Sequence, residues 1–263
     1  MSFIRHICLM LMRALCGWGG ALEAKAATSK EAAQLEALLK EHPELVLDVL
    51  REHGSELLEI VQQAADKRRT SNLQKQWEED MRKPKQVKLA GRPVGGSADA
   101  PVTIVAYSDF LCAYCHRAAF TLGSLMKHYS GKIRFVFKQT PKSEAGRLAG
   151  FWFLAGYGLD KAKGWKMYAL AFDRQSEVEA SPEKTMRAIA KEVGFDVAKL
   201  EASLKAQAKT FGEMMDADAT EADALGFVGT PYFLVNDIVV RGALSLEDFS
   251  KAVDMALEKK GGK

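Results

Sequence analysis

Two apolar, β-branched runs constrain the fold of this 263-residue chain more than any other feature. Residues 102–107 read VTIVAY, and residues 132–139 read KIRFVFKQ. A strand with one face in water alternates apolar and polar side chains, whereas a strand covered on both faces is apolar throughout. Both runs therefore predict central strands of a sheet that helices cover, which is the arrangement of an α/β domain.

The segments around these runs complete the domain. A mainly helical stretch at about 143–224 includes a helix start at Ser181-Pro182. The sequence TPYFLVNDIVVRG predicts two short strands around Asn236-Asp237, and SLEDFSKAVDMALEK predicts a closing helix with Ser245 as its N-cap. The expected order is strand, helix, strand, helical insertion, hairpin and helix, which gives a mixed sheet.

Residues 29–82 precede this domain and differ from it in composition, because they are helical in pattern and strongly charged. Pro43 and Gly54 divide them into helices, and a Pro/Gly-rich passage follows them. We therefore expect a helical stalk over 27–85 and the α/β domain over 86–260. The stalk has too little core of its own, so its apolar stripe needs a partner surface, either the same domain or copies of the stalk. The stripe includes Leu35, Leu38, Leu39, Val46, Val49 and Leu50.

The first 26 residues have features of a secretory leader. A basic start precedes the short apolar run 7–12, and Ala24-Lys25-Ala26 matches an A-x-A cleavage site, although Arg13 interrupts the apolar region. The sequence therefore predicts an exported, periplasmic protein, with an uncleaved amphipathic leader as the alternative. No run is long enough to span a bilayer. The net charge of +3 is spread without a basic block, so nucleic acid is not an expected partner.

The chemistry of the chain centres on LCAYCH, where Cys112 and Cys115 are separated by two residues and His116 follows. C-x-x-C-H matches a c-type haem attachment site, whereas C-x-x-C matches a redox dithiol or half of a zinc site. The haem hypothesis is weak, because this motif lies between a strand and a helix, whereas an attached haem needs a mostly helical pocket. Zinc would need two further ligands, and the other histidines are scattered along the chain. We expect no metal and no cofactor, and we favour the redox dithiol.

The position of the motif gives the redox interpretation a physical basis. The first turn of a helix has backbone N–H groups without intrahelical partners and a partial positive charge. A thiolate at Cys112 would be stabilised there, so its pKa would fall and it would act as a nucleophile near neutral pH. Cys115 lies one turn further along the same side, and we expect it to be buried, protonated and able to resolve a mixed disulfide.

Two separated motifs resemble the DsbA-like branch of the thioredoxin superfamily. They are APVTIVAYSDFLCAYC before the first helix and GTPYFLVNDIVVRGALSLEDF near the end, and the resemblance covers about residues 87–260. It implies a thioredoxin fold with a helical insertion at about 143–224, preceded by the helical stalk. It also implies that Pro231 is a cis-proline opposite the dithiol and that Thr230 offers its backbone to a bound peptide.

The chain departs from the family pattern at positions that tune the dithiol. Members often have a buried Glu six residues before the first Cys, where this chain has Ala106. Lys138 occupies the position of the basic partner on the next strand, so half of that charged pair is expected to be missing. Ala113-Tyr114 replaces the Pro-His of strongly oxidising members, and His116 could add positive charge. We expect a less oxidising site than that of the strongest oxidases.

The segment LLKEHPELVLDVL resembles the leader region of suppressor-of-copper-sensitivity C and Com1-like proteins, which in some relatives forms an oligomerising stalk. The resemblance implies a homo-oligomer, such as a trimer, formed through residues 29–82. It favours an isomerase or reductase of client proteins over a DsbA-type oxidase, recharged by a membrane redox partner. A non-catalytic metal or haem module and an oligomeric chaperone or adaptor remain the alternatives.

Overall fold

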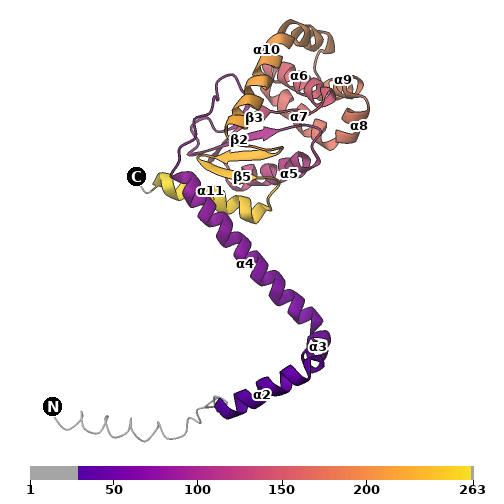
Figure 1. Cartoon of the computed structure of the whole chain (residues 1–263). Helices are drawn as coiled ribbons and strands as arrows, with labels where there is room; N and C mark the ends of the chain where they lie inside the picture. Colours follow the sequence, from indigo (N-terminus) through magenta and orange to yellow (C-terminus); the bar gives the residue numbers. More distant parts are fainter. Residues whose placement is uncertain (1–28, 262–263) are drawn as a thin grey trace, which may run out of the picture. The chain divides into compact units, whose positions relative to one another are not determined.

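The computed structural model describes residues 29–261, and its contacts divide the chain into two units after Asp66. The predicted leader at 1–26, with Cys8 and Cys16, lies outside the described residues. Figure 1 labels the elements of both units.

The first unit consists of helices. It contains α2 (Ser29–Glu41), α3 (Pro43–Glu52) and the beginning of α4 (Gly54–Met81). Pro43 occupies the first turn of α3, where its missing N–H has no intrahelical partner to lose. The large apolar side chains of this unit are exposed, namely Leu35, Leu38, Leu39, Leu45, Val46, Leu47, Val49, Leu50, Leu57, Leu58, Ile60 and Val61. The predicted apolar stripe is therefore present and uncovered in the single chain.

The second unit is built on a five-stranded sheet with the order β1-β3-β2-β4-β5. Strands β2 and β3 pair in parallel, and the other neighbouring pairs are antiparallel. The predicted hairpin is formed by β4 and β5, and Asn236 takes the positive φ of 52° that its turn requires. The strands are β1 (Val94–Gly96), β2 (Val102–Ser108), β3 (Ile133–Gln139), β4 (Tyr232–Val235) and β5 (Ile238–Arg241). The predicted α/β fold with a mixed sheet is confirmed.

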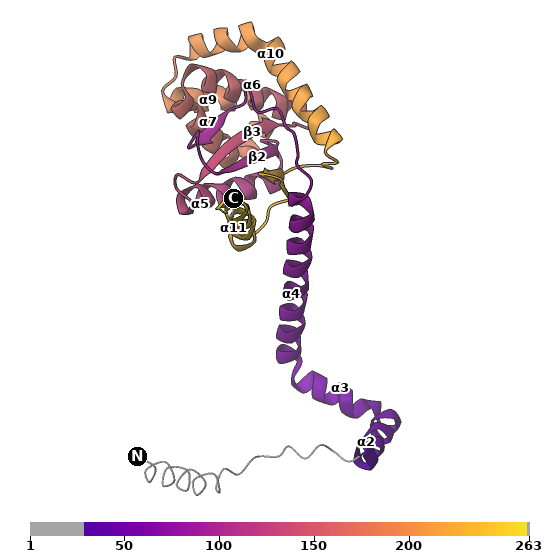
Figure 2. The same cartoon turned by 90° about the vertical axis from the view of Figure 1, so that its left-hand side faces the viewer.

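Helices cover both faces of the sheet, as the continuous apolar runs predict. Helices α5 (Ala113–His128) and α11 (Leu246–Gly261) lie on one face, and α10 (Val197–Ala224) lies on the other (Figures 1 and 2). Because successive strand side chains point to opposite faces, the core is divided into two apolar clusters. The larger cluster includes Ala106 and Phe137 together with α5, and the smaller one includes Tyr107 and Val136.

The predicted insertion is helical throughout and joins β3 to β4. It contains α6 (Glu144–Leu159), α7 (Lys161–Asp173), α8 (Gln175–Ala180), α9 (Pro182–Val193) and α10. The predicted helix start at Pro182 is confirmed, although the Ser181 side chain makes no capping hydrogen bond. The predicted cap of α11 is also confirmed, because the Asp248 backbone N–H donates to Ser245 Oγ at 3.1 Å.

The second unit begins at Lys67, which is earlier than the boundary expected near residue 86. The reason is the end of α4, where Trp77 is only 2% exposed and belongs to the larger apolar cluster. Leu73 and Met81, four residues to either side, pack against the same cluster. The apolar stripe that returns near the end of the long helix is therefore core of the sheet domain.

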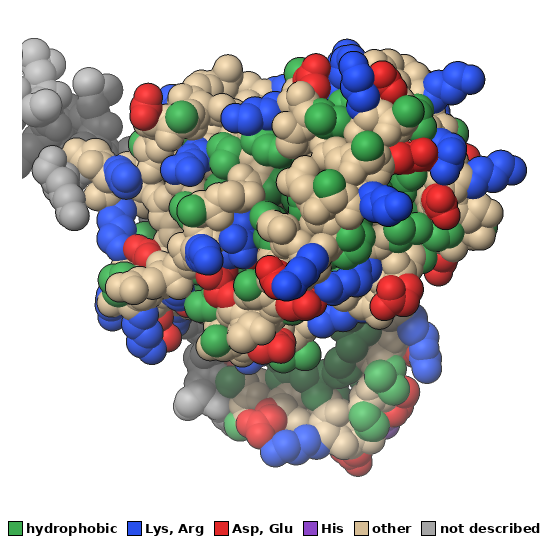
Figure 3. Space-filling model, turned by 90° about the horizontal axis from the view of Figure 1, so that it is seen from above, with side chains coloured by type: hydrophobic (Ala, Val, Ile, Leu, Met, Phe, Trp, Pro, Cys, Tyr) green, Lys and Arg blue, Asp and Glu red, His purple; other side chains and the backbone are tan. Residues whose placement is uncertain are grey.

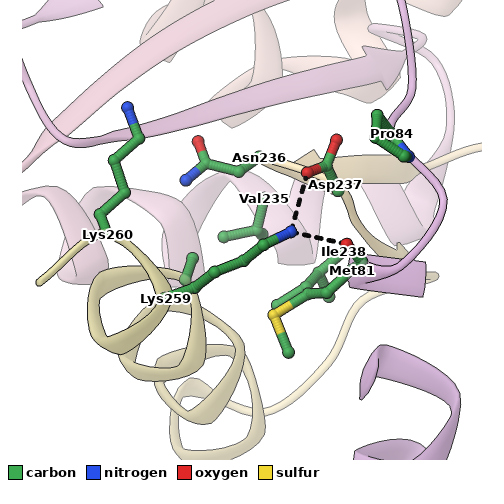
Figure 4. A pocket seen from close by; sticks show the side chains of 9 residues that line it. Met81, Pro84, Val235, Asn236, Asp237, Ile238, Lys259 and Lys260 are labelled. Carbon is green, nitrogen blue, oxygen red and sulfur yellow. Dashed lines mark hydrogen bonds and ion pairs between the residues drawn. The ribbon is translucent and has the colours of Figure 1, made fainter. Parts of the chain in front are cut away.

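The last turns of α11 are tied to the β4–β5 turn and to the end of α4. Lys259 Nζ donates to the Met81 carbonyl oxygen at 2.6 Å and approaches Asp237 Oδ2 at 3.4 Å (Figure 4). These residues line a cavity of about 280 Å³ that also contacts Lys260. The lysine thus satisfies a carbonyl at a helix end that has no intrahelical donor.

We predict that Trp77→Ala destabilises the second unit by about 3–5 kcal/mol, because it removes a large buried ring and leaves a cavity. Urea denaturation followed by circular dichroism measures the free energy of unfolding. Gln74→Ala, an exposed position on the same helix, is the matched control and should change it by less than about 0.5 kcal/mol. A loss below about 1 kcal/mol for Trp77→Ala would contradict this role.

Candidate active site

Cys112 lies where β2 gives way to α5. A turn over residues 109–112 ends with Cys112 as the N-cap of the helix, with φ −86° and ψ 120°. The Cys115 backbone N–H donates to Cys112 Sγ over 3.4 Å, and the His116 N–H donates to the Cys112 carbonyl oxygen at 3.0 Å. Cys112 therefore takes the capping position that serine or aspartate usually fills, with a sulfur as the acceptor.

The Cys112 thiolate is strongly stabilised. The pKa of Cys112 is lowered from about 9 to about 5, chiefly by the hydrogen bond from the Cys115 side chain. Burial opposes this effect, whereas the Thr230 side chain and the backbone N–H groups of Cys115 and Tyr114 add to it. At neutral pH the sulfur is therefore ionised and nucleophilic.

Cys115 has the opposite character. It is 1% exposed, and burial followed by the hydrogen bond to Cys112 raises its pKa far above the usual thiol value. The Ser108 side chain and the Asp109 backbone partly offset this increase. The two sulfurs are free thiols, so the structure describes the reduced pair, with one accessible thiolate and one buried thiol.

The loop before β4 lies against the dithiol. The Thr230 carbonyl oxygen is 3.4 Å from Cys112 Sγ, and the Thr230–Pro231 peptide bond is cis. Gly229 has a φ of 92°, which residues with a β-carbon rarely adopt. Val228, one residue earlier, is 87% exposed. Cys112 and the Thr230–Pro231 pair, which lie more than a hundred residues apart in the sequence, are thus brought together.

The other residues of the motif lie on the exposed side of α5. Ala113 begins the helix, and Tyr114 is 56% exposed with the Arg117 guanidinium 4.4 Å from its ring centroid. The ring of His116 contacts that of Phe120, with centroids 5.1 Å apart. The stabilisation of the thiolate described above is thus dominated by hydrogen bonds at the helix start.

Lys138 is separated from the dithiol, and it has acidic partners although Ala106 stands in place of the acid of the family pattern. It is fully buried, forms an ion pair with Glu221, and lies 3.5 Å from Asp218 Oδ1. Its register partner on β2 is Tyr107, so Lys138 points to the face covered by α10. Ala106 points to the opposite face with α5. An acid at position 106 would therefore not have faced Lys138.

Sequence reasoning missed the acids that accompany Lys138. Asp218 also pairs with Arg92, whose Nη2 donates to Asp218 Oδ1 at 2.7 Å, and burial raises the pKa of Asp218 despite this pair. A lysine buried within a core strand requires an acid buried near it. Nothing in the sequence indicated that α10 supplies that acid with Asp218 and Glu221.

The geometry bears on the metal and haem alternatives as well. Within residues 29–261, no group of three His, Cys, Asp or Glu side chains is arranged to hold a metal ion. Attachment of a haem needs both sulfurs to reach the porphyrin, whereas Cys115 is almost fully buried behind Cys112.

A mixed sheet that carries a dithiol at a helix start, with the loop before β4 against it, is the arrangement of the thioredoxin-fold class. A family model described as Thioredoxin matches residues 88–255, and the chain belongs to this family. The helical insertion between β3 and β4 is the arrangement that the sequence predicted.

Solved structures share the fold over most of their length. The thiol-disulfide exchange protein α-DsbA2 from Wolbachia pipientis is 24% identical and covers 73% of this chain and 97% of its own, with a TM-score of 0.59. A thioredoxin-like oxidoreductase from Silicibacter pomeroyi is 28% identical and covers 64% and 94%, with a TM-score of 0.54. ScsC from Proteus mirabilis, in a transitional conformation, is 19% identical and covers 85% and 99%, with a TM-score of 0.51.

Curated relatives match only part of this chain and a small part of their own. The Na(+)/H(+) antiporter NhaA 1 of Mycolicibacterium vanbaalenii is 27% identical over 61% of this chain, and the NhaA of Herminiimonas arsenicoxydans is 30% identical over 57%. The chain spans about a quarter of the length of these relatives, 26% and 23%. Among residues 29–261, no helix is long and apolar enough to cross a membrane.

We predict that the reduced protein titrates one thiolate with a midpoint near pH 5. Absorbance at 240 nm follows thiolate formation. Cys112→Ser should abolish this transition, and Cys115→Ala should move it to higher pH, because it removes the hydrogen bond that most lowers the Cys112 pKa. A midpoint at or above pH 8 in the unchanged protein would contradict the described geometry.

Proposed function

We propose that this protein is a thiol-disulfide oxidoreductase that acts on the disulfides of client proteins through Cys112 and Cys115. The observation that carries the proposal is the Cys112 sulfur, ionised at the start of α5 and 3.4 Å from the Thr230 carbonyl oxygen. A client chain that pairs with the backbone beside Thr230 would bring its own sulfur to Cys112. The similarity to proteins described as thiol-disulfide exchange proteins and oxidoreductases supports the same class.

The exchange proceeds in two balanced steps. The Cys112 thiolate attacks one sulfur of a client disulfide, forms a Cys112–client disulfide, and releases the other client sulfur as a thiolate. Cys115 then loses its proton, attacks Cys112 Sγ and releases the first client sulfur. The client gains two electrons, the protein keeps a Cys112–Cys115 disulfide, and a dithiol redox partner, at the membrane by our proposal, must reduce it again.

Isomerisation uses the first step alone. If another client thiolate attacks the mixed disulfide before Cys115 does, Cys112 leaves unchanged and the client has a new disulfide. The low pKa of Cys112 makes it a good leaving group, whereas the buried Cys115 is rarely ionised and attacks slowly. We therefore favour isomerase or reductase activity, with dithiol oxidation of the DsbA type as the alternative.

A moderate thiolate pKa supports this choice of direction. The pKa of the nucleophilic thiol in dithiols of this fold ranges from about 7 in thioredoxin to about 3.5 in DsbA. The Cys112 pKa of about 5 lies between these values. Ala113 and Tyr114 stand where strongly oxidising relatives have Pro-His, so that source of thiolate stabilisation is missing.

We further propose that the protein works in the periplasm, because residues 1–26 have the features of a secretory leader and the dithiol suits an oxidising compartment. Its partners there are proteins with cysteines, with no nucleic acid. On the face drawn in Figure 3, basic and acidic side chains are interspersed among apolar ones.

The exposed leucines and valines of residues 31–66 support a homo-oligomer, for which we propose a trimer formed through residues 29–82. Copies of an amphipathic helix can bury such side chains against one another. Each side chain that is fully buried stabilises the assembly by about 1.5–3 kcal/mol. Several dithiols in one assembly would suit repeated attack on a misfolded client.

Three assays on the mature protein test the activity: insulin reduction, oxidation of a dithiol peptide and refolding of a protein with scrambled disulfides. We predict isomerisation above the rate with free thiols and slow oxidation. Cys112→Ser should abolish all three activities, whereas Cys115→Ser should accumulate a mixed disulfide visible on non-reducing gels, because Cys115 no longer resolves it. Full activity of Cys112→Ser would overturn the assignment.

The proposed oligomer can be tested with substitutions of exposed residues, which leave the buried core unchanged. Leu47→Glu together with Ile60→Glu places charges on the exposed apolar surface, and Gln34→Glu is the control on an exposed polar position. Sedimentation should show a trimer for the unchanged protein and the control, and a smaller species for the double variant. Isomerisation should fall severalfold while insulin reduction persists, and an unchanged mass would exclude this surface as the interface.

A further inference from the structure

One peptide group in the turn before Cys112 is held at both ends by side chains. The peptide joins Phe110 to Leu111 in the turn of residues 109–112. Its N–H, on Leu111, donates to Asp109 Oδ1 at 2.9 Å. Its carbonyl oxygen, on Phe110, accepts a hydrogen bond from Gln175 Nε2 at 2.6 Å. The central peptide of a turn can rotate with little movement of its neighbours, and these two bonds fix its orientation.

Asp109 links this turn to the start of the helical insertion. Its carboxylate is buried, at 5% exposure, and Oδ2 accepts the Lys142 backbone N–H at 2.9 Å. Gly146 allows this approach, because a β-carbon there would lie 2.6 Å from Asp109 Oδ1. The Asp109 carbonyl oxygen also accepts the Cys112 N–H at 3.2 Å. The loop after β3 and the turn before Cys112 therefore share one buried carboxylate.

Gln175 provides the second link, from a part of the chain 63 residues after Cys112. It is the first residue of α8, within the insertion, and is partly buried. The Phe110 side chain packs beside it against Phe172 of α7, with ring centroids 4.9 Å apart. The insertion thus contacts the turn through both an apolar ring and a directed hydrogen bond.

We propose that Gln175 is a positioning residue for thiol-disulfide exchange: through the Phe110–Leu111 peptide it holds Cys112 as the N-cap of α5. The inference rests on the proposed function of the dithiol. The Cys115 N–H donates to Cys112 Sγ over 3.4 Å. Because a hydrogen bond weakens steeply as its angle closes, a rotation of the turn that moves Cys112 Sγ off this N–H would weaken the cap.

The test compares Gln175→Leu and Gln175→Glu with the unchanged protein. Both variants keep about the size of the side chain. Leu has no donor for the Phe110 carbonyl oxygen, and Glu has none once it is ionised. Absorbance at 240 nm measures the thiolate of Cys112. We expect the ratio of thiolate to thiol at pH 5 to fall by up to about fivefold in both, the equivalent of one lost hydrogen bond.

Gln207→Leu is the matched control. The amide of Gln207 donates only to Ser203 Oγ on the exposed surface of α10, at 2.9 Å, so the variant should titrate like the unchanged protein. Urea denaturation of every variant separates positioning from stability. A lower free energy of unfolding with an unchanged titration in Gln175→Leu would overturn the proposal, because Gln175 would then be merely structural.

The experiment also separates this proposal from the proposed function. If the unchanged protein exchanges no disulfides but Gln175→Leu still shifts the thiolate titration, the positioning role stands and the enzymatic assignment fails. If the unchanged protein is active and both Gln175 variants match it in titration and in rate of exchange, the positioning role fails alone.

Discussion

The capping of α5 by a sulfur is the interaction on which the rest of this site depends. Cys112 receives the Cys115 N–H because β2 ends at Ser108 and a short turn follows before the helix begins. The partial charge at the start of a helix acts only over its first turn. A nucleophile placed one turn later would lose this stabilisation, so the position of the strand end sets the chemistry of the sulfur.

The sheet separates this chemistry from a second group of charges. The dithiol lies on the face with α5, whereas Lys138 lies on the face with α10, between Glu221 and Asp218. Burying these charges costs free energy that their pairing offsets, and removal of one partner leaves the other uncompensated. The ionic group therefore fixes how α10 packs on the sheet, and the hydrogen bonds at the helix start govern the reactivity of Cys112.

The periodicity of the sequence was enough to predict the order of the strands and helices and the helical insertion, and two separated motifs carried the resemblance to the DsbA-like branch. Local chemistry also placed Cys112 at a helix start, since an apolar strand and an amphipathic helix flank it. The contacts of Lys138 and Gln175 could not be predicted, because they join segments more than sixty residues apart. Trp77 was assigned to the stalk for the same reason: its stripe indicates burial but not which surface covers it.

The asymmetry of the two sulfurs follows from a spacing of three residues combined with the face that α5 buries. Its buried residues include Cys115, Ala118, Leu122 and Leu125, which recur every three or four positions and lie on one side of the helix. Cys112 precedes this series by one turn and caps the helix, so it keeps access to solvent while Cys115 enters the core. The hydrogen bond between the two side chains lowers the pKa of Cys112, and burial together with this bond raises the pKa of Cys115. A single motif thus encodes both an ionised nucleophile and a protonated partner, provided that the turn before it holds its shape.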